Sequence, residues 1–161
     1  MEWQESFSRK NPLNSRIRDT DVFLHGTSLK KYRAMQSKGF LLTRLKNKNF
    51  SISQNGICFE KYDEHGKYSD MIKNTIRNYC ETACRNDQSS EGVILRIKGR
   101  ELKKLGCPIY ADWNKNYIPK YNNEGIPIDV DYNAPFLSII VVDTDIPLEC
   151  LEEVRRISFK D

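Results

Sequence analysis

The stretch VFLHGTS, residues 22–28, carries the strongest structural signal in this chain. Its apolar beginning predicts a buried strand over 22–25, and the polar residues that follow are expected at the strand's exit, where loops hold functional groups. Ser28 stands where a helix N-cap belongs, because apolar residues recur at helical spacing after it until Gly39, which suits a left-handed helix end. We therefore expect His25 to lie between a strand and a capped helix.

The residues at this junction have complementary chemistry. His25 offers a ring nitrogen to a ligand hydroxyl, Gly26 lets a backbone amide approach a ligand because it has no β-carbon, and Thr27 adds a hydroxyl that braces the turn. Together they suit a small polar ligand. The alternative is a plain strand-to-helix turn in which the histidine bonds a neighbouring carbonyl, and these residues alone leave both interpretations open.

The length and composition predict one globular domain. A chain of 161 residues can bury a core that needs no disulfide or metal, and its 39% hydrophobic and 30% charged residues are typical of folded proteins. Residues 1–20 mix basic and polar side chains without a sustained period. We expect them to form a basic N-terminal arm ahead of a single domain over 21–161.

The charge balance and the hydropathy pattern limit the partners. Lysine and arginine number 26 against 22 acidic residues, so the net charge of +4 permits an anionic partner without requiring one. No apolar run approaches the roughly 20 residues that a membrane span needs, and the N-terminus lacks the pattern of a signal peptide. A soluble, cytoplasmic protein without a membrane partner is therefore expected.

The five cysteines are scattered and odd in number, unlike a secreted disulfide framework, so reduced thiols are expected. Cys80 and Cys84 lie one helical turn apart, but a zinc site needs further ligands, and His25 and His65 are the only histidines. No metal is expected. A separate hypothesis pairs Cys58 with one of these histidines as a thiol hydrolase, although its apolar neighbours predict a buried, unreactive thiol.

Further along the chain, apolar periodicity predicts an α+β fold of short strands and a few helices. The expected helices cover 29–38, 68–84 and 100–105, and a last helix is expected from Pro147 to Arg156. The expected core strands lie at 57–59, 93–97 and 137–142, with a loop over 60–67. The proline-rich and aromatic segment 107–136 is too long to be a simple connection and is expected to have a function.

Three motifs follow one another along the chain: the HGTS sequence that begins at His25, the tetrapeptide GICF at 56–59 followed by Tyr68, and a final strand that leads into Ile146 and Pro147. In this order they resemble the diphtheria-toxin-like ADP-ribosyltransferases. That superfamily includes the poly(ADP-ribose) polymerases, DNA-modifying toxins and, more distantly, the tRNA 2′-phosphotransferases. The resemblance implies a split mixed or antiparallel β-sheet core with flanking helices.

The resemblance also implies a binding site for NAD, which these enzymes use as a substrate. The implied role of His25 is to bond a ribose hydroxyl, that of the Gly26 backbone is to bond the nicotinamide amide, and that of Tyr68 is to stack on the nicotinamide ring. Cys58 replaces a second stacking tyrosine, which should weaken binding by about 0.5–1.5 kcal/mol. The implied NAD-binding set is completed by Thr27, Ser28 and Phe59.

The third motif departs from the family pattern. A family glutamate commonly begins the last long strand, where its carboxylate stabilises the sugar cation, but this chain has Ser138 at that place. The implied catalytic set is therefore His25, Ser138 and a carboxylate from elsewhere, for which Glu124 in the aromatic segment is the candidate. Alternatively the reaction tolerates the absence of a carboxylate, or the fold binds its ligand without reacting.

The function that the resemblance implies is transfer of ADP-ribose from NAD to a macromolecular acceptor, protein or nucleic acid, as in a toxin or effector. Two other activities of such a fold are NAD hydrolysis and a reaction like that of the tRNA 2′-phosphotransferases. A non-enzymatic alternative is a module that binds NAD or nucleic acid, with the basic arm and the basic loop 44–48 as its contacts.

Overall fold

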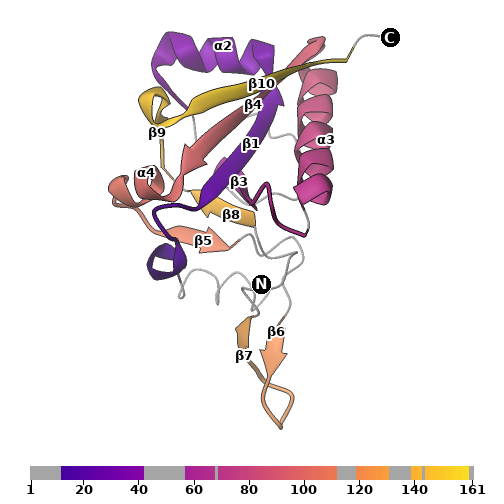
Figure 1. The fold of residues 1–161 in the computed structure, drawn as a ribbon. Coiled ribbons are helices and arrows are strands. Elements are labelled where there is room, and N and C mark those ends of the chain that lie inside the picture. The colour runs from indigo at the N-terminus through magenta and orange to yellow at the C-terminus, as the bar shows by residue number, and fades with distance from the viewer. Residues whose placement is uncertain are drawn as a thin grey trace.

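The computed structural model describes residues 12–41, 57–67, 69–111, 119–130, 139–142 and 144–159. Its main sheet consists of β1 (Val22–Ser28), β3 (Ile57–Tyr62), β4 (Glu91–Lys98), β5 (Ile109–Ala111), β8 (Ile139–Val142) and β10 (Glu152–Ser158). These strands pair antiparallel in the order β10-β4-β1-β3-β8-β5 (Figure 1). Two short pairs stand beside it, β2 (Phe40–Leu41) with β9 (Ile146–Pro147), and β6 (Pro119–Tyr121) with β7 (Pro127–Val130). The predicted α+β class is confirmed.

β1 occupies the middle of this sheet. It pairs with β4 along all seven of its residues, from Val22 opposite Lys98 to Ser28 opposite Gly92. The strand is therefore longer than the predicted 22–25, because β4 binds the backbone of the polar residues as well. β3 is likewise longer than predicted and includes residues 60–62, which were expected in a loop. β8 lies between β3 and β5, which confirms the prediction of an inner strand.

The helix after β1 forms as its end signals predict. α2 (Leu29–Lys38) begins at Ser28, whose hydroxyl accepts a hydrogen bond from the backbone N–H of Lys31 at 3.1 Å. It ends at Gly39, which adopts a left-handed φ of 81°. Its buried side chains face a core cluster that also holds residues of β1, β3 and β4. α2 and the short helix α4 (Gly99–Lys104) thus cover one face of the sheet.

α3 (Ser69–Asp87) covers the opposite face and contacts β1 and β4 (Figure 1). Ile72, Ile76 and Ala83 are buried on it, as the predicted amphipathic face requires, and the helix continues three residues beyond the expected end at 84. Ile72 and Ile76 form a second core cluster with Leu24 of β1. Within the described residues, no helix combines the length and the apolar character needed to cross a membrane.

The prediction of a last helix from Pro147 to Arg156 is wrong. Only a 3-10 turn, η3 (Leu148–Cys150), follows Pro147, and the chain then forms β10 along the free edge of β4. The apolar residues at helical spacing favour a helix only weakly. The backbone hydrogen bonds to β4 favour a strand more strongly. Most of β10 is exposed, and its charged side chains are typical of a sheet edge that must resist pairing with other chains.

The second half of the predicted arm belongs to the domain. Leu13 and Ile17, on either side of a 3-10 turn (η1, Asn14–Arg16), are only 6% and 5% exposed and join the core cluster. The backbone N–H of Leu13 donates to the carbonyl of Ile109 on β5 at 2.7 Å. Residues 12–20 therefore close one end of the sheet, and the first half of the arm, 1–11, lies outside the described residues.

Candidate functional site

The strands that carry the three motifs lie side by side in the sheet. β1 holds His25, β3 holds Cys58 and Phe59, and β8 begins immediately after Ser138, in the order β1-β3-β8. Leu24 of β1 lies opposite Glu60 of β3, and Cys58 lies opposite Val141 of β8. Segments that are more than 30 residues apart in the chain are therefore neighbours at one place in the sheet.

The imidazole of His25 bridges β1 and β3. Its Nδ1 lies 2.7 Å from the backbone carbonyl oxygen of Cys58, and since a carbonyl only accepts, Nδ1 must carry the hydrogen. In the neutral ring this leaves Nε2 with a lone pair that accepts a hydrogen bond. The ring centroid lies 5.4 Å from that of Phe59, with the planes tilted by 50°. The imidazole is thus held in one orientation by a polar and an aromatic neighbour.

Partial burial favours the neutral form of this histidine. Loss of water contact lowers the pKa of His25 below 6.5, the bond to the Cys58 carbonyl partly opposes this, and the nearby charge of Lys31 lowers the pKa further. A neutral ring at pH 7 is the form whose Nε2 can accept a ligand hydroxyl. The charge that acts on the ring is a cation, and no described carboxylate contributes to the shift.

The lowered pKa makes the stability of the fold depend on pH. Because the unfolded chain binds a proton more readily than the folded His25, this contribution to stability is complete above pH 6.5 and is lost as the pH falls toward the folded pKa. The slope approaches about 1.4 kcal/mol per pH unit at most. In urea titrations between about pH 7 and 5, His25→Gln should flatten this slope.

A matched control for this experiment is His65→Gln, because the side chain of His65 is 88% exposed. This variant should keep the slope of the unmodified protein. Equal slopes in both variants would mean that burial of His25 does not control the pH dependence.

Beyond Leu24, β1 and β3 no longer form a ladder. β3 pairs with Val22, Phe23 and Leu24 only, whereas β4 pairs with β1 up to Ser28. The next contact between β1 and β3 is the bond from the His25 ring to Cys58, a side-chain contact in place of a backbone pair. The edge of β1 at Gly26 that faces β3 is therefore outside the ladder between these two strands.

The structure gives a structural reason for the glycine of the HGTS motif. A β-carbon on Gly26 would lie 2.7 Å from the carbonyl oxygen of Ile76 and 2.9 Å from Sγ of Cys80, both on α3. The position must be glycine so that α3 can pack on β1, whatever binds on the other face. The close packing of α3 therefore explains the glycine at position 26 without the expected approach of a ligand.

Thr27 and Ser28, both expected in the NAD-binding set, are buried. Thr27 is 2% exposed and Ser28 is fully buried. The hydroxyl of Ser28 caps α2 and also donates a hydrogen bond to the Asp87 carboxylate at the end of α3. The side chain of Ser28 therefore joins two helices, and its role in binding a ligand stays a prediction.

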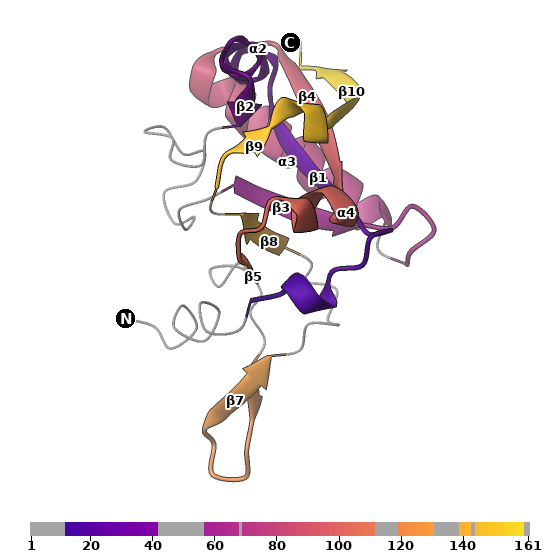
Figure 2. The same cartoon turned by 90° about the vertical axis from the view of Figure 1, so that its left-hand side faces the viewer.

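The remaining predicted residues are not brought to His25 by the described part of the chain. Tyr68 and Ser138 lie outside the described residues. Glu124 is exposed in the turn of the β6–β7 hairpin, where its backbone N–H donates to the Asn122 side chain at 2.9 Å. Figure 2 shows this hairpin projecting away from the sheet, so Glu124 is placed apart from His25.

A buried carboxylate that the sequence analysis missed lies on β3. Glu60 is only 2% exposed, and its Oε1 accepts a hydrogen bond from the Tyr79 hydroxyl of α3 at 2.9 Å. Because it is paired with Leu24, Glu60 faces α3, the side of the sheet opposite to the His25 ring. The alternation of side chains along β3 could have predicted a buried position after Phe59. Only the structure shows that β3 extends past Phe59, which places the Glu60 carboxylate at a buried position.

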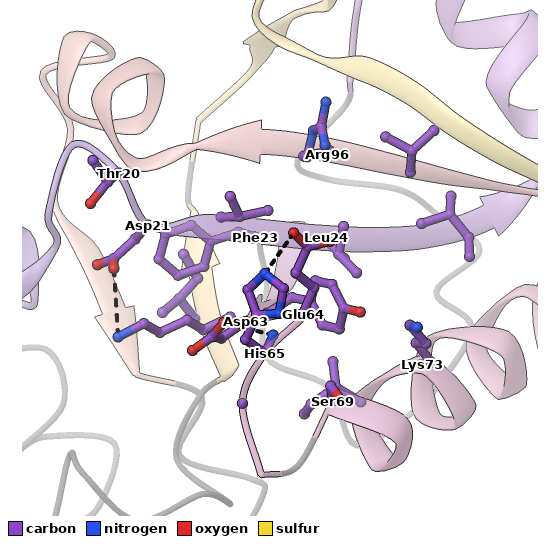
Figure 3. Close-up of a pocket in the computed structure, with 18 of the residues that line it drawn as sticks. Thr20, Asp21, Phe23, Leu24, Asp63, Glu64, His65, Ser69, Lys73 and Arg96 are labelled. Carbon is purple, nitrogen blue, oxygen red and sulfur yellow. Dashed lines mark hydrogen bonds and ion pairs between the residues drawn. The ribbon is translucent and has the colours of Figure 1, made fainter.

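One pocket among the described residues is a hollow of about 1190 Å³ near the beginning of β1, and it is not lined by His25 or Cys58. Figure 3 shows its polar side chains, among them Asp21, His65 and Lys73. His65 is exposed there, with Nε2 3.3 Å from Glu64.

The thiol-hydrolase hypothesis gains no support, because His25 bonds the carbonyl of Cys58 and not its thiol.

The cysteines of α3 are packing residues. Burial raises the pKa of the Cys80 thiol to about 11, and its Sγ lies 3.5 Å from the carbonyl oxygen of Val93. Among the described residues, no group of three or more His, Cys, Asp or Glu side chains is arranged to hold a metal ion.

Comparison with protein-family models, with curated proteins and with solved structures found no match to this chain.

Proposed function

We propose that the protein binds NAD beside His25 and transfers its ADP-ribose to a macromolecular acceptor, protein or nucleic acid. The observation that carries this proposal is the adjacency of β1, β3 and β8, with the His25 ring held at the point where β1 and β3 separate. The strands that carry parts of the three motifs are neighbours in this arrangement, which supports an ADP-ribosyltransferase-like version of the α+β fold.

The chemistry of His25 suits one part of this ligand. Nε2 of the neutral ring accepts a hydrogen bond from a ribose hydroxyl, and the peptide groups of β1 near Gly26 lie outside the ladder with β3, where they can bond a carboxamide. Both contacts would fix the nicotinamide riboside in one orientation. In the reaction, the bond from the anomeric carbon to nicotinamide breaks, the acceptor nucleophile bonds to that carbon, and the acceptor loses its proton.

A second candidate is a module that binds NAD without transferring ADP-ribose. Glu60 faces α3 and Glu124 lies in the projecting hairpin, so the described residues bring neither carboxylate to the His25 ring. A carboxylate is the group that usually stabilises the sugar cation of such a reaction. If no residue outside the described ranges supplies one, binding without turnover is the expected behaviour.

The first experiment is a thermal shift with NAD. A ligand that binds only the folded chain stabilises it by about 2.7 kcal/mol at 100 times its Kd, so the melting temperature should rise by several degrees. His25→Ala should abolish this rise relative to its own baseline, whereas His65→Ala, the matched control at an exposed histidine, should preserve it. No rise in the unmodified protein at millimolar NAD would contradict both candidates.

The second experiment distinguishes the ADP-ribosyltransferase from the module that only binds NAD. The protein is incubated with NAD labelled on its adenosine, in the presence of separate pools of protein, DNA and RNA. Label in one macromolecular pool, absent with His25→Ala, supports the transferase. Free labelled ADP-ribose in place of labelled macromolecule would assign NAD hydrolysis, and a thermal shift with neither product would assign the binding module.

A further inference from the structure

The hollow near the beginning of β1 lies apart from the proposed NAD site, and its charge is strongly biased. Of the residues that line it, eight are lysine or arginine and three are aspartate or glutamate. In the whole chain these classes are nearly balanced, at 26 and 22. The weak positive charge of the protein is therefore concentrated in this hollow, which favours an anionic ligand there.

The cations of the hollow differ in whether they are paired with an acidic residue. Asp21 is bound by Arg18 at 3.3 Å and lies 3.8 Å from Lys61 (Figure 3), and the other two acidic residues, Asp63 and Glu64, directly follow Tyr62 in the chain. Lys73 on α3 and Arg155 on β10 are exposed and form no ion pair with any described residue. Two walls of the hollow thus present cations that can bind an anion.

The floor between these walls is apolar and partly open. It includes Leu24 of β1 and Ile94 of β4, and Val154 of β10 is 41% exposed beside it. The Tyr62 ring contributes an aromatic surface, with Nζ of Lys73 6.0 Å from its centroid. Arg96 also lines the floor; its Nη2 is ion-paired with Glu152, whereas its buried Nε donates no hydrogen bond to any described residue. A planar group with hydrogen-bond acceptors would satisfy this surface.

We propose that this hollow binds single-stranded nucleic acid, with phosphates held by the cations of α3 and β10 and a base placed against Tyr62 and Arg96. Charges spread over two walls suit a polymer with repeated phosphates better than one compact anion. The recessed apolar floor can be reached by an unpaired base, whereas the bases of a duplex are stacked inside it. The inference goes beyond the proposed NAD chemistry and requires neither NAD nor His25.

The test measures fluorescence anisotropy of a short, fluorescein-labelled oligothymidylate over about 50–200 mM salt. Reversing one cation on each wall, in Lys73→Glu/Arg155→Glu, should weaken binding roughly tenfold or more and reduce the slope of log affinity against log salt by about 1.4. Tyr62→Ala should weaken binding roughly fivefold or more at nearly unchanged slope, because stacking does not release counterions.

The matched control is Arg33→Glu/Lys38→Glu, which changes the net charge equally at exposed positions of α2, on the other face of the sheet. It should retain affinity and slope, and melting curves of both double variants should show that they remain folded. His25→Ala should also bind the oligonucleotide normally, so failure of the NAD proposal would be distinguishable from failure of this one.

Several results would overturn the inference. One is equal weakening by the two double variants, which would indicate only overall charge. Others are tighter binding of a duplex of the same length, displacement by poly-glutamate at matched charge, or preference for phosphatidylserine vesicles, which would assign the hollow to a duplex, an acidic peptide or a lipid surface. No binding of the oligonucleotide at low salt would also reject it.

Discussion

Replacing Phe59 with alanine should lower the free energy of unfolding by about 3–5 kcal/mol, a large part of the stability of an ordinary domain. Phe59 is completely buried in β3 and packs in the core cluster beneath α2. Alanine would remove the ring and leave a cavity that the neighbouring strands cannot close, because β1 and β8 hold β3 on both sides. Urea unfolding, with the slope m checked for constancy, measures the loss.

The matched control is Tyr121→Ala, which removes an aromatic ring that is 57% exposed in the β6–β7 hairpin. Its effect should stay within about 0.5 kcal/mol. A cost below about 1 kcal/mol for Phe59→Ala would mean that the ring is not packed as the structure shows. Phe59→Ala should also loosen the His25 imidazole, whose aromatic neighbour it removes.

Gly99→Ala should be the second most damaging of the predicted substitutions, at about 3 kcal/mol, the upper end of the usual cost of overpacking. A β-carbon on Gly99 would lie 2.0 Å from the carbonyl oxygen of Arg18 and 2.9 Å from Cγ2 of Ile17. The obstacle is backbone, so no side-chain rotation relieves it. The segment 17–21 would have to move, which would strain the 2.7 Å bond from the Gly99 N–H to the Asp21 carbonyl.

The adjacent residue provides the control for this prediction. Lys98 is exposed, and its substitution by alanine should change the unfolding free energy by no more than about 0.5 kcal/mol. The midpoints of thermal and urea unfolding should therefore differ strongly between Gly99→Ala and Lys98→Ala. If Gly99→Ala were as stable as Lys98→Ala, residues 12–20 would not be packed against α4, and the predicted arm over 1–20 would be restored.

The elements that were predicted well are those with strong local signals. α2 has a side-chain cap at Ser28 and a left-handed glycine at its end, and both act within a few residues of the helix. α3 has a long amphipathic pattern, and the strands β4 and β8 are rich in β-branched residues. Such signals depend on neighbours in the chain, so they can be read without knowing what packs against them.

The errors arose where distant partners determine the conformation. Residues 147–156 have apolar residues at helical spacing, but residues 152–158 pair with the free edge of β4 and form a strand. β1 and β3 continue past their apolar residues because adjacent strands bind their peptide groups. The polar residues of the HGTS motif were expected at the strand's exit for the same reason, since the sequence does not show how far β4 extends alongside them.

The same distinction between local signals and distant contacts applies to the candidate site. Residue types and order alone predicted Ser28 as a cap and the chain as an α+β domain, and the structure confirms both, whereas the central role of His25 stays a prediction. The tertiary structure was needed to show that Cys58 holds the His25 ring through its carbonyl, that α3 requires the glycine at 26, and that Glu60 faces away from the ring. These facts depend on strand register and helix packing, which arise from contacts between residues far apart in the chain.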